Sequence, residues 1–181
     1  RRVFTLEGTA PGTLPWEDLL KPTRHSKAAL DKHRPDPDAP AHTMLSGGTT
    51  ALSKISRFTC NDLMAMLDNF ALSIELGEND VAAALAPAGT GATGYVYPIL
   101  APLLWGATSV ILERWGQNVP EAVQLILDHH CTYAIGIPTQ LTLMVPELEK
   151  HRPEEFAAFR AFSNAGAPLP FDTAEKIERL M

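Results

Sequence analysis

From residue 59 onward, apolar residues recur at two different spacings along the chain. Across residues 63–74 they follow at intervals of three and four, which predicts a helix with one apolar face: Leu63, Met66, Leu67, Phe70 and Ile74. Thr59 and Asp62 resemble a capping box at the start of this helix.

Strand-like and helix-like segments then alternate. Short runs rich in apolar and β-branched residues predict strands at 41–45, 81–85, 108–112, 132–135 and 161–163. Helical patterns fall between the later ones, at 95–105, at 118–127 with Asn118 as N-cap, at 138–148, and from the N-cap Asp172 onward. This alternation with short connections predicts an α/β fold, with a largely parallel sheet and flanking helices.

The first 40 residues have a different character. Short helices are expected around 16–20 and 27–32, and the proline-rich stretch 34–40 cannot lie inside a helix. We therefore expect an irregular lead-in over 1–40 and the α/β part over 41–181. Because the chain stops at Met181 within a predicted helix, we also expect it to be an internal piece of a longer polypeptide.

Composition narrows the class of protein. With 45% hydrophobic residues and a net charge of −6, the chain is typical of a globular domain and unlike a nucleic-acid binder. Its longest apolar stretch, 95–112, contains Pro98, Pro102 and Gly106, so no membrane span is predicted. Two cysteines cannot form a disulfide framework, which favours the reducing cytoplasm.

In parallel sheets, ligands bind at loops that leave the carboxyl ends of strands, and we expect three loops there: 46–54, 87–94 and 164–170. The first carries two adjacent glycines, several hydroxyls and one lysine, a combination that suits a polyphosphate. It is neither a Walker A loop nor a dinucleotide fingerprint. The alternative is a polar surface turn.

This loop resembles the phosphate loop of the adenylate-forming superfamily, which includes acyl- and aryl-CoA synthetases and nonribosomal adenylation domains. It departs from that pattern at Ala51, Ser53 and Ile55. Three further segments resemble the family in the right order: 98–112, 137–139 and 165–170. The family's later signatures do not occur in the chain, so the resemblance implies an incomplete N-terminal domain without the C-terminal domain.

The resemblance implies that a carboxylic acid is activated by ATP and Mg²⁺ to an acyl-adenylate and transferred to a thiol, with coenzyme A favoured. It implies that the phosphates are held by Ser46, Gly47, Gly48, Thr49, Thr50 and Lys54. It places the adenine against Gly166, Ala167 and Pro168, and the acid near Thr90, Gly91, Gly136 and Pro138. No catalytic residue and no metal ligand is assigned within the 181 residues, which we expect to be inactive alone.

Two alternatives stay open. One is an aryl-acid ligase that loads a carrier protein, although Thr90 and Gly91 stand where hydroxybenzoate-activating relatives have His-Asn. The other is a noncatalytic nucleotide-binding module on the same scaffold. A metal site at 128–131 is disfavoured, because histidines are expected near helix C-termini. Cys60 and Cys131 are expected to be packing thiols.

Overall fold

The computed structural model describes residues 4–5, 8, 10–21, 25–45, 54–112 and 118–181. The chain divides into two compact units, residues 1–36 and 37–181. The first contains a short parallel pair, β1 (Phe4–Thr5) and β2 (Leu14–Pro15), then the 3₁₀ helix η1 (Trp16–Asp18) and the helix α1 (Lys27–Asp31). The Ser26 hydroxyl caps α1 by accepting a hydrogen bond from the Ala29 N–H.

The second unit is built on a parallel sheet of four strands in the order β6-β5-β7-β8. The strands are β5 (Val81–Ala84), β6 (Thr108–Ile111), β7 (Tyr133–Gly136) and β8 (Ala161–Asn164). The α/β class and the parallel sheet are thereby confirmed. All four carboxyl ends consequently lie at one edge of the sheet.

Helices precede, connect and follow these strands. They are α2 (Cys60–Ser73), the π-helix η2 (Ala92–Leu100), α3 (Ala101–Leu104), α4 (Val119–Asp128), α5 (Pro138–Leu148), the 3₁₀ helix η3 (Pro153–Phe156) and α6 (Phe171–Leu180). Within the described residues, none of these helices has the length and apolar character needed to cross a bilayer.

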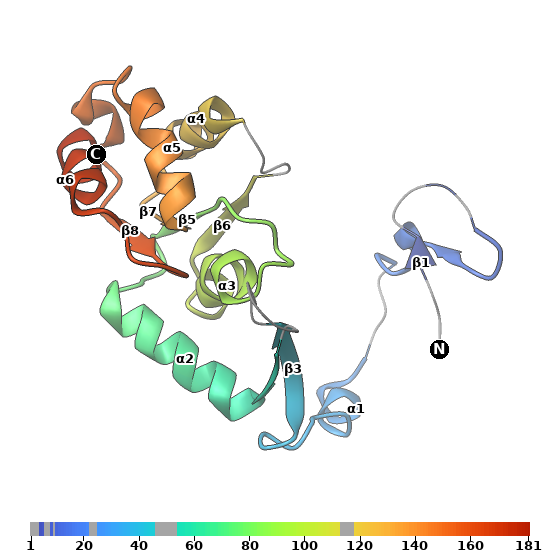
Figure 1. Ribbon diagram of the computed structural model, residues 1–181. Coiled ribbons are helices and arrows are strands. Elements are labelled where there is room, and N and C mark those ends of the chain that lie inside the picture. Colours follow the sequence, from blue (N-terminus) through green and yellow to red (C-terminus); the bar gives the residue numbers. More distant parts are fainter. Residues whose placement is uncertain (1–3, 6–7, 9, 22–24, 46–53, 113–117) are drawn as a thin grey trace. The chain divides into compact units, whose positions relative to one another are not determined.

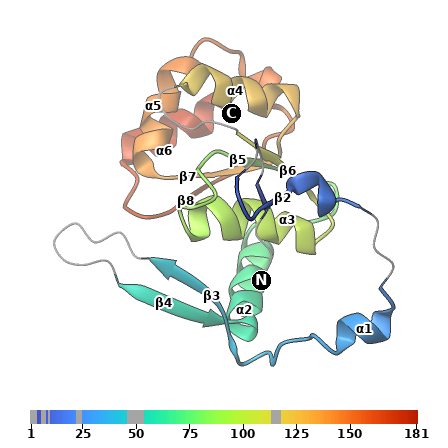
Figure 2. The same ribbon diagram turned by 90° about the vertical axis from the view of Figure 1, so that its right-hand side faces the viewer.

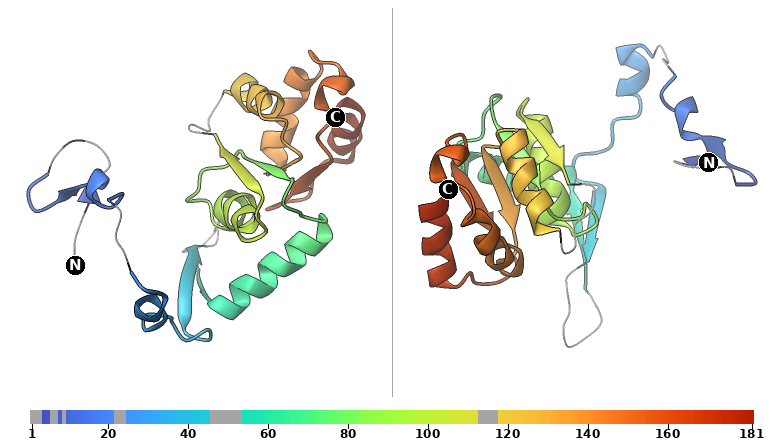
Figure 3. Two further views of the ribbon diagram at one scale, coloured as in Figure 1. Left: turned by 180° about the vertical axis from the view of Figure 1, so that it is seen from behind. Right: turned by 90° about the horizontal axis from the view of Figure 1, so that it is seen from above.

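Successive residues of the central strands point into two different cores. Ala83 and Ala134 pack with α4, α5 and α6, whereas Ala82, Tyr133 and Ile135 pack with α2 and η2. Figure 1 shows these helix groups on opposite sides of the sheet, and the view from behind in Figure 3 shows the same separation. The result is a three-layer arrangement in which both faces of the sheet are covered.

An ion pair with a buried carboxylate joins the amino ends of three strands. Asp80, just before β5, accepts hydrogen bonds from Arg160, just before β8, at 2.7 and 3.0 Å. The Thr132 hydroxyl, just before β7, donates to the same carboxylate at 2.6 Å and accepts from the Val81 N–H. Burial raises the pKa of Asp80, but the hydrogen bonds from Arg160 and its neighbours outweigh burial, and the pKa lies below its ordinary value.

The strand before the glycine-rich loop does not belong to the parallel sheet. The predicted strand 41–45 exists as β3 (Pro40–Leu45), but it pairs antiparallel with β4 (Ile55–Thr59) in a separate two-stranded sheet. Figure 2 shows this hairpin beside α2. The prediction that loop 46–54 leaves the carboxyl edge of the parallel sheet is therefore wrong. The strand β4 was missed because exposed Ile55 and Arg57 give it no apolar face.

Helix boundaries also correct the sequence predictions. The capping box of α2 is present, with the Thr59 hydroxyl accepting from the Asp62 N–H at 3.0 Å. Asn118 lies at the N-cap of α4, but its side-chain amide donates to Glu121 instead of accepting from the backbone. Helix α6 begins at Phe171, so Asp172 lies in its first turn and is not its cap. The helix predicted at 95–105 begins at Ala92 and is a π-helix up to Leu100.

The Asp80–Arg160 pair yields a stability prediction. Arg160→Met removes one partner and leaves the buried carboxylate without its cation. We expect a loss of about 2 kcal/mol in the free energy of unfolding, less than for a fully buried pair because the guanidinium is partly exposed. Urea unfolding measures the loss. The control Lys150→Met, which breaks an exposed pair on α5's C-terminal side, should leave the unfolding midpoint unchanged.

The same carboxylate yields a pH dependence. The pKa of Asp80 is lower in the folded state than in the unfolded state. Its contribution to the free energy of unfolding is therefore complete above the unfolded pKa of about 4, and this contribution is lost as the pH falls through the folded pKa. The stability difference between the wild type and Asp80→Asn should therefore be constant from pH 7 to about pH 5 and shrink below about pH 4. Urea unfolding at stepped pH measures it, and a constant difference down to pH 3 would contradict the assignment.

Candidate functional site

Three segments that the structure describes leave the carboxyl edge of the parallel sheet after β5, β7 and β8. Loop 87–91 follows β5, the turn at Ile137 and Pro138 follows β7, and segment 165–170 follows β8. Since β5 pairs with β7 and β7 pairs with β8, the three segments leave neighbouring strands. Two of the three loops expected at this edge are therefore found there.

The loop after β5 is held in a tight backbone conformation. The Thr90 hydroxyl and the Thr90 N–H both donate to the Pro87 carbonyl, at 2.6 and 2.9 Å. Gly91 has φ +66°, a backbone conformation that side chains rarely adopt. A Cβ at Gly94, in the first turn of η2, would lie 2.0 Å from the Pro87 carbonyl oxygen. The loop can therefore fold back on η2 only because residue 94 is glycine.

This loop and β3 enclose a pocket of about 520 Å³. Its lining contains apolar, hydroxyl-bearing and aromatic residues and, within the described residues, no charged side chain: His42, Thr43, Met44, Leu45, Ala88, Gly89, Thr90, Gly91 and Tyr95. The His42 and Tyr95 rings stack, with centroids 5.8 Å apart and an interplanar angle of 20°. The volume lies within the range of small-molecule sites.

The segment after β8 is tied to the strand ends. The Ala165 N–H donates to the Gly136 carbonyl at 3.1 Å, and the Asn164 side-chain amide donates to the Ala167 carbonyl at 2.8 Å. Gly166 has φ +89°, which requires glycine. Gly166, Ala167 and Pro168 are exposed.

The glycine-rich loop lies largely outside the described residues. Ser46, Gly47, Gly48, Thr49 and Thr50 belong to that undescribed part, and Lys54 follows it at the start of β4. Leu45 and Ile55, on either side, are register partners in the hairpin. The loop is thus the connection of a β-hairpin.

The residues predicted for the acid site divide between two places. Thr90 and Gly91 line the pocket against β3. Gly136 ends β7 and Pro138 begins α5, and neither is among the residues that line this pocket. Gly136 packs instead under α5, where an added Cβ would lie 3.0 Å from Leu141 Cδ2.

Sequence reasoning missed three polar residues at these loops. His42 and Tyr95 line the pocket, and the buried Asn164 Oδ1 has no hydrogen-bond partner within the described part of the chain. His42 and Met44 are half-buried between exposed neighbours in β3, but residues 41–45 do not alternate between apolar and polar types, so the sequence carries no signal that identifies His42. Tyr95 lay inside a predicted apolar helix and gave no such signal.

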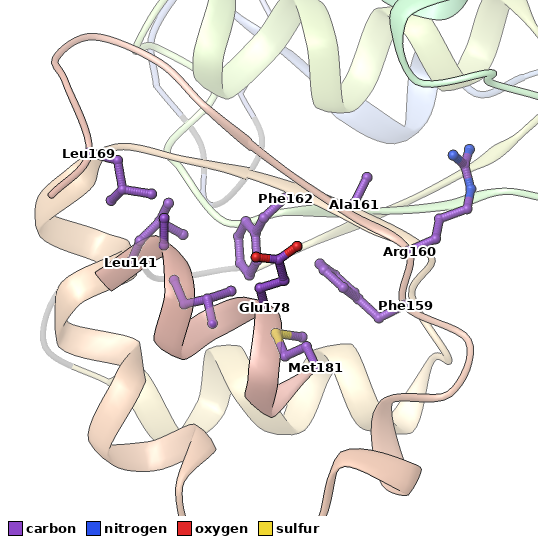
Figure 4. Close-up of a pocket in the computed structure, with 10 residues that line it drawn as sticks. Leu141, Phe159, Arg160, Ala161, Phe162, Leu169, Glu178 and Met181 are labelled. Atoms are coloured by element: carbon purple, nitrogen blue, oxygen red, sulfur yellow. The ribbon is translucent and has the colours of Figure 1, made fainter. Parts of the chain in front are cut away.

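A second cavity, of about 440 Å³, lies between β8, α5 and α6. Figure 4 shows its mostly apolar lining, with Phe159 and Phe162 beside Glu178. The Arg160 guanidinium points away from Glu178 in this view, toward its bonds with Asp80. The Arg160 guanidinium is therefore not available to bind a phosphate in this cavity.

The remaining candidate groups have ordinary structural roles. Burial raises the pKa of the Cys131 thiol to about 11, so the thiol is neutral at physiological pH. His129 and His130 follow the C-terminus of α4, as the sequence indicates. In the part of the chain that the structure describes, no three acidic, histidine or cysteine side chains gather as metal ligands.

Comparison with known proteins identifies the family. The family described as "AMP-binding enzyme" matches residues 6–181. The chain belongs to this AMP-binding enzyme family. The adenylate-forming resemblance carried by the four sequence segments is thereby confirmed.

Individual members of the AMP-binding family are distant in sequence. The chain is 29% identical over 182 residues to the medium-chain fatty-acid–CoA ligase of Escherichia coli K12, covering 99% of this chain and 31% of the relative. It is 30% identical over 126 residues to the 2-hydroxy-7-methoxy-5-methyl-1-naphthoate–CoA ligase of Streptomyces carzinostaticus, covering 70% of this chain and 22% of the relative. The chain thus spans less than a third of the length of these curated relatives.

A solved member of the same fold supports the architecture. The apo structure of Mycobacterium smegmatis MbtA superposes with a TM-score of 0.74 at 23% identity, covering 98% of this chain and 31% of that chain. At this identity the likeness shows the fold, an AMP-binding domain with the parallel sheet described above.

The close approach at Gly94 yields a prediction for this site. Gly94→Ala should destabilise the protein by about 1–3 kcal/mol, because the new Cβ meets the Pro87 carbonyl oxygen, a backbone atom that cannot rotate away. Gly89→Ala is the matched control, since a Cβ at residue 89 meets nothing within 4 Å. Thermal unfolding measures both. Equal midpoints for the two variants would show that loop 87–91 does not fold back on η2 as described.

Proposed function

We propose that the protein activates a carboxylic acid with ATP and transfers the acyl group to a thiol, with coenzyme A as the favoured acceptor. Membership of the AMP-binding enzyme family over residues 6–181 is the observation that carries the proposal. Both curated relatives described above are named as CoA ligases, which supports this choice of thiol. The compartment that fits ATP, CoA and two free cysteines is the cytoplasm.

We assign the polyphosphate to the hairpin loop. Backbone N–H groups at Gly47 and Gly48 and the hydroxyls of Ser46, Thr49 and Thr50 would donate to phosphate oxygens, and Lys54 would add a positive charge. Phosphoryl transfer depends mainly on positioning and charge stabilisation, which these groups supply. We assign no residue of this chain to the Mg²⁺ ion that accompanies ATP.

We assign the adenine to the exposed backbone at Gly166, Ala167 and Pro168. Two hydrogen bonds hold this segment against β7 and β8, which supports a fixed surface for a flat base. We place the acid beside loop 87–91, with Thr90 and Gly91 lining its pocket. Gly136, at the end of β7, and Pro138, at the start of α5, would lie between this pocket and the adenine segment.

In the first step, a carboxylate oxygen attacks the α-phosphorus of ATP, a new P–O bond forms, and pyrophosphate leaves with the electrons of the broken bond. In the second, a thiolate attacks the acyl carbon and AMP leaves. The residues assigned here bind and orient the substrates. Since no catalytic residue is assigned within the chain, we expect residues 1–181 alone not to catalyse the first step.

Acid-dependent exchange of pyrophosphate into ATP tests the proposal on the full-length protein. Exchange should appear with at least one acid from a panel of aliphatic and aromatic acids. Lys54→Met should raise the KM for ATP by about 10- to 100-fold, because a charge-assisted contact to the phosphates is lost. The control Lys176→Met, on the exposed side of α6, should leave this KM unchanged.

The outcomes separate the alternatives. Exchange followed by formation of a CoA thioester supports the acid–CoA ligase. Exchange without transfer to CoA supports the runner-up, an aryl-acid ligase that loads a carrier protein. ATP binding without exchange for any acid would leave the noncatalytic nucleotide-binding module and overturn the proposed reaction.

A further inference from the structure

The segment after β8 is held by one hydrogen bond on each side of a glycine. Before the glycine, the Ala165 N–H donates to the Gly136 carbonyl at 3.1 Å. After it, the Ala167 carbonyl accepts from the Asn164 side-chain amide at 2.8 Å. Gly166 lies between these bonds with φ +89°. Because glycine has more backbone freedom than any other residue, the two bonds restrict the part of the segment that is costliest to order.

The peptide unit between Ala167 and Pro168 can be held by a hydrogen bond only through its carbonyl. Pro168 has no N–H, so this unit has an acceptor and no donor. The Asn164 amide donates to that acceptor. Because a carbonyl can only accept, the Asn164 atom that faces it is the amide nitrogen, and Oδ1 is the buried atom. Asn164 therefore orients the peptide plane that precedes Pro168.

Asn164 acts on the exposed part of the segment through the backbone. The side chain of Asn164 is half-buried and its Oδ1 atom is buried, whereas residues 166–168 are exposed. A ligand that lies against residues 166–168 thus meets a backbone whose conformation depends on the Asn164 amide. A backbone that is ordered before binding loses less conformational entropy when the ligand binds, so its affinity for the ligand is higher.

We infer that Asn164 is a positioning residue for the nucleoside part of ATP, and that it acts by fixing residues 166–168 before ATP binds. This inference rests on the proposed function, because it uses the assignment of adenine to these residues. The polyphosphate is assigned to the hairpin loop after β3, a different part of the chain. Loss of the Asn164 bond should therefore weaken the binding of the nucleoside and leave the binding of the phosphates unchanged.

Titration calorimetry on the full-length protein tests the inference, with ATP and inorganic triphosphate as separate probes. Asn164→Ala should raise the Kd for ATP about tenfold, because the segment must then be ordered on binding, and should leave the Kd for triphosphate within about twofold. Asn164→Leu keeps a side chain of similar size but has no donor, so it should show the same pattern. The control Asn69→Ala, at an exposed position on α2, should change neither Kd.

The same titrations separate positioning from a purely structural role. If Asn164 only supported the fold, its variants would contain less folded protein, which lowers the number of sites per chain and leaves the Kd of the remaining sites unchanged. An unchanged Kd for ATP in both variants would therefore overturn the inference, and so would an equal rise for ATP and triphosphate.

The proposed function fails on a different measurement. If the wild type binds ATP but exchanges pyrophosphate with no acid, the proposed reaction is overturned, while the predicted difference between ATP and triphosphate in the Asn164 variants would still support the positioning role. If the wild type binds no ATP, both the proposed function and the inference are overturned.

Discussion

The hydrogen-bond network around Asp80 aligns the strands of the parallel sheet, and the rest of the second unit depends on this alignment. One carboxylate receives hydrogen bonds from residues that precede β7 and β8 and itself precedes β5, so the amino ends of three strands are fixed to a common point. Parallel strands have no hairpin turn to fix their register. With the amino ends aligned here and strand lengths of four residues, the carboxyl ends also align, and the loops that leave them become neighbours.

Two of the loops proposed to bind ligands lie at the other edge of the sheet, away from this network. Loop 87–91 and segment 165–170 depend on local backbone bonds and on glycines at Gly91, Gly94 and Gly166. The residues that join the amino ends of the strands are therefore different from those that we propose to bind ligands. This division is general for open α/β sheets, in which binding residues follow the carboxyl ends.

Much of the fold could be predicted from the sequence, because in most helices and strands the local pattern of apolar residues agrees with the packing in the folded protein. The alternation of helices with strands such as 81–85 and the bounds of α5 at Pro138 and Leu148 could be predicted from apolar spacing and proline placement. The strand β4 could not, because it is stabilised by pairing with β3 and not by an apolar face. The Asp80–Arg160 pair joins residues 80 positions apart, a contact that no local pattern encodes. The loops of the site could be named from their glycines, but the contribution of β3 to the pocket depends on tertiary packing.

The strand β3 also limits the distance between the pocket and the start of the glycine-rich loop. The same strand carries His42 in the pocket wall and, four residues later, runs into the glycine-rich sequence at Ser46. Four residues of extended chain span about 13 Å at most, because each residue of a strand adds about 3.3 Å. The Cα atoms of His42 and Ser46 can therefore lie no more than about 13 Å apart. The pocket residue His42 and the first residue of the loop that we propose to bind phosphate are thus close along the same chain segment.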